Sequence, residues 1–281
     1  MSSRQFTFFG FLKLTRFWNL LIIAMAQYFA VDFFIDKSKI WDVRLFVLSL
    51  STVIIAAAGY IINDYYDVKI DLINKPERVV IGKDVARRYA LLFHSLLSMI
   101  GVALGFLLGW KIGVINFFSA FLLWWYSNDL KRQPFIGNFV VALLTGLSIF
   151  LVNILYHVHS PLVTIYALFA FAMTLVREIV KDAEDLKGDN TFGCKTLPII
   201  WGVRKTKIFL YFLITLFFIS VIGINQLFEQ LPMYYFFTFL FAPLVLLVIW
   251  LIRADTSKDF HKVSQWCKVI MLLGISSMIF I

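Results

Sequence analysis

Two short segments of the sequence concentrate the acidic residues. Of 17 Asp and Glu residues, five lie between residues 64 and 84, and five lie between residues 178 and 189. In the first segment, NDYYDVKID, the residues Asn63, Asp67 and Asp71 recur every four positions. On a helix, this spacing predicts that their oxygen-bearing side chains stack along one face.

The second segment, KDAEDLKGD, places Asp182, Asp185 and Asp189 at i, i+3 and i+7, which predicts a second one-faced ladder on a helix. Stacked carboxylates repel one another unless cations lie among them. Magnesium prefers hard oxygen ligands and commonly joins a few carboxylates to substrate phosphates. The two ladders therefore predict a magnesium-dependent clamp for a diphosphate. A solvated helix end would explain one such segment equally well, but two segments weaken that alternative.

Basic residues accompany the acids. Lys131 and Arg132 follow one apolar stretch, and Lys181 and Lys195 lie within or just after the second acidic segment. Such side chains beside a metal-bound diphosphate would stabilise the charge of the leaving group. Each basic residue alone is better explained as a marker of membrane orientation, so only their joint placement favours a functional role.

The elements that position these residues are apolar. The chain has 281 residues, of which 61% are hydrophobic and only 15% charged, against about 45 to 50% and about 25% in soluble proteins. A soluble globule could not bury this much apolar surface, and two cysteines exclude a disulfide-stapled module. Continuous runs favour helices over barrel strands. The sequence thus predicts an all-α integral membrane protein, a single domain over residues 1–281 with about nine transmembrane helices, or eight because the fourth stretch is short. The predicted spans are 17–35, 44–62, 88–108, 112–127, 135–156, 161–180, 207–225, 232–252 and 263–281.

The charges also predict an orientation. With a cytoplasmic N-terminus, 22 of the 26 Lys and Arg residues lie in cytoplasmic segments, which agrees with the positive-inside rule. Both acidic segments are then cytoplasmic, and the expected location is the inner (plasma) membrane of a prokaryote. The net charge of +9 needs no nucleic-acid partner. Cys194 and Cys267 lie on the same side and match no metal-binding pattern.

The motifs resemble those of a known family. NDYYDVKIDLINKPER is similar to the NDxxDxxxD signature, and DLKGD to the DxxxD signature, of the UbiA-type intramembrane prenyltransferase superfamily. The order of spans and motifs agrees over nearly the whole chain. Within the superfamily, REIVKDAEDLKGDNTFGCKTLPI most resembles the lipid-making branch, and less closely the quinone, chlorophyll and haem branches.

This resemblance implies helices around a central cavity that both motifs cap on the cytoplasmic side, with Mg²⁺ bridging them to an isoprenyl diphosphate. The implied metal ligands are Asn63, Asp67 and Asp71 for one ion and Asp185 and Asp189 for the other, with Asp64 and Asp182 as supporting acids. The residues that resemble substrate contacts of the family are Arg16, Asn19, Arg78, Tyr126, Lys131 and Lys195.

The expected reaction is Mg²⁺-dependent transfer of an isoprenyl group, geranylgeranyl in the lipid branch, through an allylic carbocation. The acceptor is a lipid alcohol such as geranylgeranylglyceryl phosphate or, alternatively, an aromatic ring (hydroxybenzoate or dihydroxynaphthoate) of a quinone precursor. Asp64 or Asp182 is the candidate base for the acceptor's proton. A cation transporter is a third possibility, although relay carboxylates usually lie near the midplane of a span. Besides membrane lipid, no obligate protein partner is expected.

Overall fold

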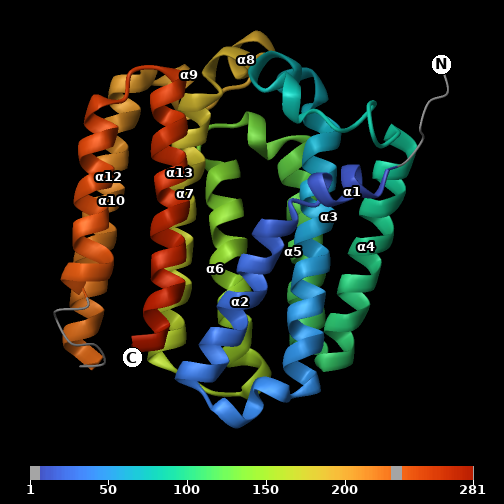
Figure 1. Ribbon diagram of the computed structural model, residues 1–281, viewed down its shortest axis with the longest axis vertical. Helices are drawn as coiled ribbons and strands as arrows, with labels where there is room; N and C mark the ends of the chain where they lie inside the picture. The colour runs from blue at the N-terminus through green and yellow to red at the C-terminus, as the bar shows by residue number, and fades with distance from the viewer. Residues whose placement is uncertain (1–6, 229–235, 281) are drawn as a thin grey trace.

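Helices form all the regular structure of residues 7–228 and 236–280, the part of the chain that this computed structural model describes, and no β-strand forms there. The long helices run side by side along one axis, as Figure 1 shows. They are α2 (Phe17–Phe34), α3 (Val43–Asn74), α4 (Arg87–Leu108), α5 (Trp110–Asn128), α6 (Ile136–Tyr156), α7 (Pro161–Glu184), α10 (Gly202–Phe228), α12 (Ala242–Arg253) and α13 (Ser257–Ser277). The short ones are α1 (Phe8–Leu14), η1 (Lys37–Trp41), η2 (Pro76–Arg78), η3 (Leu130–Arg132), α8 (Leu186–Thr191), α9 (Leu197–Ile200), η4 (Phe236–Phe241) and η5 (Met278–Phe280).

Each predicted span falls on a helix. Residues 232–235 of the eighth span and residue 281 of the ninth lie outside the described residues. Within the described chain, seven helices are long and apolar enough to cross a membrane: α2, α3, α4, α6, α7, α10 and α13. The apolar segment Phe239–Arg253 is shorter, and α5 carries Lys111 and several polar residues. The chain is therefore a helical membrane protein.

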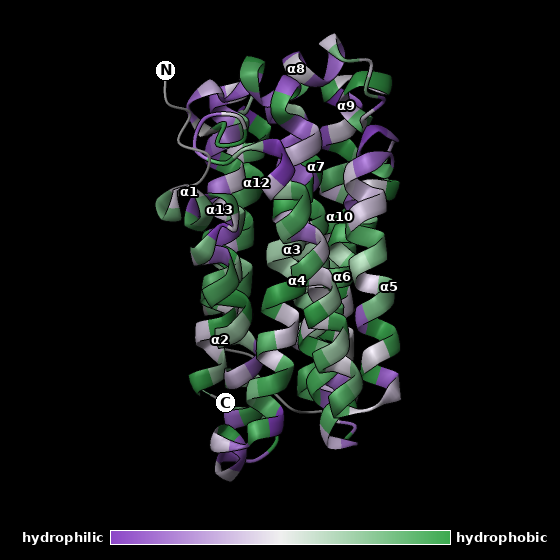
Figure 2. Cartoon of the chain, turned by 90° about the vertical axis from the view of Figure 1, so that its right-hand side faces the viewer, coloured by the Kyte–Doolittle hydropathy of each residue, from purple (hydrophilic) through white to green (hydrophobic). Residues whose placement is uncertain are grey.

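Helix α3 carries the first acidic segment beyond the apolar layer. The Asp42 side chain caps its N-terminus by accepting from the Arg44 N–H at 2.8 Å. Its 32 residues extend over about 48 Å, whereas the hydrocarbon core of a bilayer is about 30 Å thick. Pro76 ends the helix because it biases Lys75 away from helical angles. Figure 2 shows hydrophilic residues concentrated at the end of the bundle where α3 finishes.

Helix α7 ends within the second acidic segment, so the prediction of one continuous ladder there is wrong. Asp182 lies on α7 and Asp189 on α8, with Asp185 at the junction between them. In a continuous helix, the Gly188 N–H would bond to the Glu184 carbonyl. Instead, the Gly188 N–H donates to Asn74 Oδ1 at 2.9 Å, and Ser257 Oγ donates to the Glu184 carbonyl at 2.8 Å. Side chains from α3 and α13 thus replace the helical bond and break the helix.

Two groups of helices build the molecule. In one, α3 packs against α4 and α5, and in the other, α7 packs against α6, α10 and α13. Glycines allow close approach within each group: a Cβ on Gly146 would lie 2.8 Å from the Ala167 carbonyl oxygen, and one on Gly101 would lie 2.5 Å from an Ile55 side-chain carbon. Such contacts are typical of helices that associate in membranes. Helix α2 touches α3, α6 and α13, and so joins the two groups.

Candidate active site

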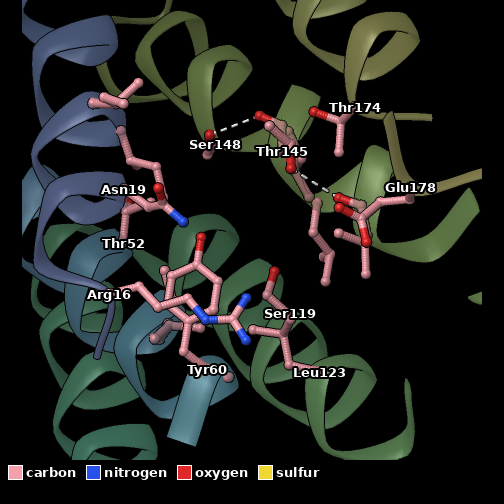
Figure 3. A pocket seen from close by; sticks show the side chains of 18 of the residues that line it. Arg16, Asn19, Thr52, Tyr60, Ser119, Leu123, Thr145, Ser148, Thr174 and Glu178 are labelled. Carbon is pink, nitrogen blue, oxygen red and sulfur yellow. Dashed lines mark hydrogen bonds between the residues drawn. The ribbon is translucent and has the colours of Figure 1, made fainter. Parts of the chain in front are cut away.

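A cavity of about 240 Å³ lies between the two groups of helices. Arg16, Asn63, Tyr126 and Lys131 line it toward the acidic segments. Farther along, its walls are mainly apolar, with a few hydroxyl and amide side chains among them. Figure 3 shows Arg16 beside Tyr60, and Thr174 and Glu178 on the wall across from Asn19 and Thr52. The cavity can therefore hold an apolar chain with a polar head.

The first acidic segment stacks on α3 as predicted. Asn63 Nδ2 donates to Asp67 Oδ2 at 2.8 Å, across one helical turn. Asp67 is buried and forms an ion pair with Lys131 of η3. Burial opposes the charge of Lys131, but the attraction of Asp67 outweighs it and holds the pKa of Lys131 well above its usual range. Asp71, on the next turn, is half-buried.

Asp64 faces a different partner. Its Oδ1 accepts from Arg16 Nη2 at 2.8 Å, and the Arg16 guanidinium lies 4.8 Å from the centre of the Tyr60 ring. Arg16 has a left-handed backbone conformation, with φ of 53°, between α1 and α2. This turn directs the predicted pair Arg16 and Asn19 into the cavity wall.

The second acidic segment is held by neighbours from three elements. Asp182 accepts from Asn138 Nδ2 of α6 at 2.9 Å, and Asp185 pairs with Lys75 at 2.7 Å. Asp189 is buried, with 4% of its surface exposed. Burial raises the pKa of Asp189 to about 6; Lys131 opposes this rise, and Asp185 and Asp67 add to it. Because Asp67 belongs to the other segment, both segments contribute to one electrostatic site.

Lys75 connects the two segments directly. It follows the last residue of α3 and contacts Glu184 at 2.8 Å as well as Asp185. Burial opposes its charge, but these two carboxylates raise the pKa of Lys75 above its usual value. His261 of α13 also contacts Glu184, at 2.9 Å. The end of α3 is thereby tied to the junction of α7 and α8.

Of the predicted site residues, those that line the cavity are Arg16, Asn19, Asn63, Tyr126 and Lys131, whereas the predicted acids lie outside its lining. Lys195 has an exposed side chain, and its backbone N–H donates to the Arg132 carbonyl at 2.7 Å. The side chain of Arg78 lies outside the described part of the chain. Over the described ranges, no three His, Cys, Asp or Glu side chains lie close enough together to hold a metal ion. The metal ligand sets and the contact of Lys195 with substrate stay predictions.

Sequence reasoning missed several side chains of the site. Arg177 and Glu178 line the cavity from α7, beside Lys181, which the sequence had indicated, and Asn138 and Lys75 hold the acids. The signal for Arg177 and Glu178 was their place: they are charged residues at the end of an apolar stretch, one helical turn before Lys181. No sequence signal identifies Asn138 or Lys75 as partners, because those contacts join distant parts of the chain.

The fold and the site define an integral membrane protein in which two acidic segments meet at one end of a largely apolar cavity. The chain belongs to the UbiA prenyltransferase family, whose model matches residues 18–269. It is therefore a prenyltransferase, as the two motifs predict.

Similar proteins agree with this assignment. Digeranylgeranylglyceryl phosphate synthase of Methanosphaera stadtmanae is 31% identical over 264 residues, which cover 90% of this chain and 93% of the relative. One solved structure superposes on this chain with a TM-score of 0.74 and 25% identity, and the match covers 96% of both chains. It is described as giving insights into the biosynthesis of digeranylgeranylglyceryl phosphate synthase in membranes. A UbiA homolog from Archaeoglobus fulgidus bound to GPP and Mg²⁺ shares the fold, with a TM-score of 0.63 and 14% identity over 96% of this chain and 99% of its own.

Proposed function

We propose that this protein transfers a geranylgeranyl group from geranylgeranyl diphosphate to geranylgeranylglyceryl phosphate, in a Mg²⁺-dependent reaction. The observation that carries the proposal is that the two acidic segments share their charges: Asp67 pairs with Lys131, which lines the largely apolar cavity, and both Asp67 and Lys131 act on the buried Asp189. The similarity to proteins named digeranylgeranylglyceryl phosphate synthase supports the choice of substrates.

The residues present fit magnesium. Asn63 donates its amide to Asp67, which leaves Asn63 Oδ1 buried and, within the described chain, without a hydrogen-bond partner. A carbonyl oxygen in this state beside carboxylates is a suitable ligand for a hard cation. We assign Asn63, Asp67 and Asp71 to one ion and Asp185 and Asp189 to the other. When bound, magnesium supplies Lewis-acid stabilisation of the diphosphate.

The side chains of the protein then act on the two substrates. Lys131 and Arg16 approach the diphosphate, and we assign Arg78 and Lys195 to the same anion; together they favour departure of the negatively charged leaving group. The allylic C–O bond breaks with its electron pair going to the diphosphate, and the acceptor oxygen forms the new C–O bond. The aromatic faces of Tyr60 and Tyr126 line the cavity, where a ring can stabilise the allylic cation.

The acceptor hydroxyl loses its proton as the new bond forms. We assign this proton to Asp64 or Asp182, one acid from each motif that we do not assign to a metal ion. Asp64 is paired with Arg16, and Asp182 with Asn138, so neither is free of other contacts. Substitution of each by Asn separates the two assignments. Only the variant that lacks the true base should transfer more slowly without binding the diphosphate more weakly.

We further propose that nine helices cross the membrane, that the whole chain is one domain, and that the N-terminus and both acidic segments face the cytoplasm. The excess of Lys and Arg at the acidic end supports this orientation. We place the protein in the plasma membrane of a prokaryote, where both substrates are lipids.

One assay tests the proposal. Purified protein in lipid nanodiscs receives radiolabelled geranylgeranyl diphosphate and Mg²⁺ with either geranylgeranylglyceryl phosphate or an aromatic acceptor, hydroxybenzoate or dihydroxynaphthoate. We expect a labelled ether lipid with the first acceptor and none with the aromatic ones. A prenylated aromatic product alone would instead assign the protein to quinone synthesis.

A further inference from the structure

Four charged side chains of the cavity wall are not used by the diphosphate site. Arg177, Glu178 and Lys181 lie on α7, and Lys268 lies on α13. Both helices are long and apolar enough to cross a membrane. Charged residues inside such helices are costly and usually mark a site that handles a polar or charged ligand.

The contacts within this group leave an excess of positive charge. Glu178 Oε1 accepts from Arg177 Nη1 at 2.7 Å, and Glu178 Oε2 accepts from Lys181 Nζ at 2.8 Å. One carboxylate is thus shared by two cations of α7. Arg177, Lys181 and Glu178 together therefore carry a net charge of about +1.

Two polar atoms of the same wall lack hydrogen-bond partners in the described structure. Arg177 Nε and Thr174 Oγ1 are both buried and unpaired. Thr174 is 4% exposed, lies one helical turn from Arg177 and Glu178, and lines the cavity (Figure 3). Buried donors without partners are costly, so these atoms indicate a ligand that supplies oxygen acceptors.

Thr174 and Arg177 lie farther along α7 from the second acidic segment, whereas Lys181 lies only four residues before Asp185. At the diphosphate end, the cations have their own carboxylates, since Arg16 pairs with Asp64 and Lys131 with Asp67. Arg177 precedes Asp185 by eight residues on α7, or about 12 Å of helix. The diphosphate would repel a second anion nearby unless that anion had cations of its own.

We propose that Arg177 and Lys181 bind the phosphate monoester of the acceptor lipid, with Thr174 donating to the same head group. This inference rests on the proposed function and adds the site of the acceptor to it. A phosphate monoester carries a charge of about −1.5 to −2 at pH 7, which the excess positive charge of this group attracts. The planar guanidinium of Arg177 suits two phosphate oxygens at once.

The test compares two acceptors that differ only in the phosphate. Transfer rates are measured in nanodiscs with geranylgeranylglyceryl phosphate and with the dephosphorylated geranylgeranylglycerol. We expect the wild type to prefer the phosphorylated acceptor. In Arg177→Gln, the KM for geranylgeranylglyceryl phosphate should rise by roughly 10- to 100-fold. Arg177→Gln should leave the KM of the diphosphate donor and the rate with geranylgeranylglycerol nearly unchanged, and Arg177→Lys should restore part of the preference.

The controls separate this inference from the proposed function. Lys205→Gln removes an exposed charge of α10 and should change neither KM. Equal losses with both acceptors in Arg177→Gln, or a raised donor KM, would overturn the acceptor site while the proposed function stands. If the wild type transfers to neither lipid but prenylates an aromatic acceptor, the proposed function itself fails.

Discussion

The two acidic segments show how differently the same kind of motif can be built. The first lies on one continuous helix, α3, where Asn63 and Asp67 are joined by a hydrogen bond across one turn. The second is divided between α7 and α8, and its backbone is held by Asn74 of α3 and Ser257 of α13. The first segment is therefore ordered by local helical spacing, and the second by contacts from distant parts of the chain.

The acids of the two segments are therefore positioned by different contacts. The side chains of α3 keep their relative places as long as the helix persists. The relative places of Asp185 and Asp189 depend on Asn74, which accepts from the Gly188 N–H at 2.9 Å and donates to the Asp185 carbonyl at 3.1 Å. Because Asn74 ends α3, the first segment also positions the second.

The largest effect should come from removing one acid of each segment. Asp67→Asn and Asp185→Asn each remove a charge that we assign to a metal ion, so release of diphosphate should fall by roughly a thousandfold in both variants. Release is measured with labelled geranylgeranyl diphosphate, and folding by size-exclusion chromatography in detergent. Asp255→Asn, at a carboxylate that is 85% exposed, is the matched control and should retain activity. Near-normal release of diphosphate in both site variants would contradict the assignment of these acids to metal ions.

A smaller effect should distinguish the divided segment from the continuous one. In Gly188→Ala, the new Cβ would lie 2.4 Å from Asn74 Nδ2, so Asn74 or α8 must shift. Loss of a residue that orients metal ligands typically costs 10- to 100-fold, and we expect a loss of about that size in the affinity for Mg²⁺. Gly223→Ala, where among the described residues no atom outside the local helix backbone lies within 4 Å of the new Cβ, should behave as the wild type. Unchanged Mg²⁺ affinity in Gly188→Ala would show that α8 needs no such support.

The smallest effect concerns pH. Burial raises the pKa of Asp189 to about 6 from a usual 3.8, so the folded protein binds this proton more tightly than the unfolded chain. The contribution of Asp189 to stability therefore decreases as the pH rises from about 4 to about 6. Metal binding needs the deprotonated form, so the affinity for Mg²⁺ should fall up to about tenfold per unit as the pH drops below 6.

Titration calorimetry between pH 5 and 7.5 measures this effect. In Asp189→Asn, the pH dependence of Mg²⁺ affinity near pH 6 should disappear, although the affinity itself is lower. If the same dependence persists in the variant, another group is responsible for it.

The sequence was sufficient for features that depend on local spacing. Apolar stretches predicted where the helices lie, although α3 continues 12 residues beyond its predicted span. The four-residue spacing of Asn63 and Asp67 predicted their stacking, because a helix fixes which side chains share a face. The motifs also predicted the prenyltransferase family that the comparisons confirm.

Contacts between distant segments could not be predicted in this way. The break at Asp185 requires Ser257, 73 residues away from Glu184, and nothing in the local sequence KDAEDLKGD indicates it. The pairing of Lys75 with Asp185 and of Lys131 with Asp67 likewise depends on how α3, η3 and α7 pack. Charges in the loops are compatible with many partners until the helices are placed.

The most direct test of the central claim is the position of the metal ions. Crystals grown with Mn²⁺ and a non-hydrolysable geranylgeranyl thiodiphosphate would locate the ions by anomalous scattering. The account predicts ions in contact with Asp67 on α3 and with Asp185 or Asp189 at the α7–α8 junction, both touching the same diphosphate. Ions bound to one segment only, with the diphosphate elsewhere, would contradict it.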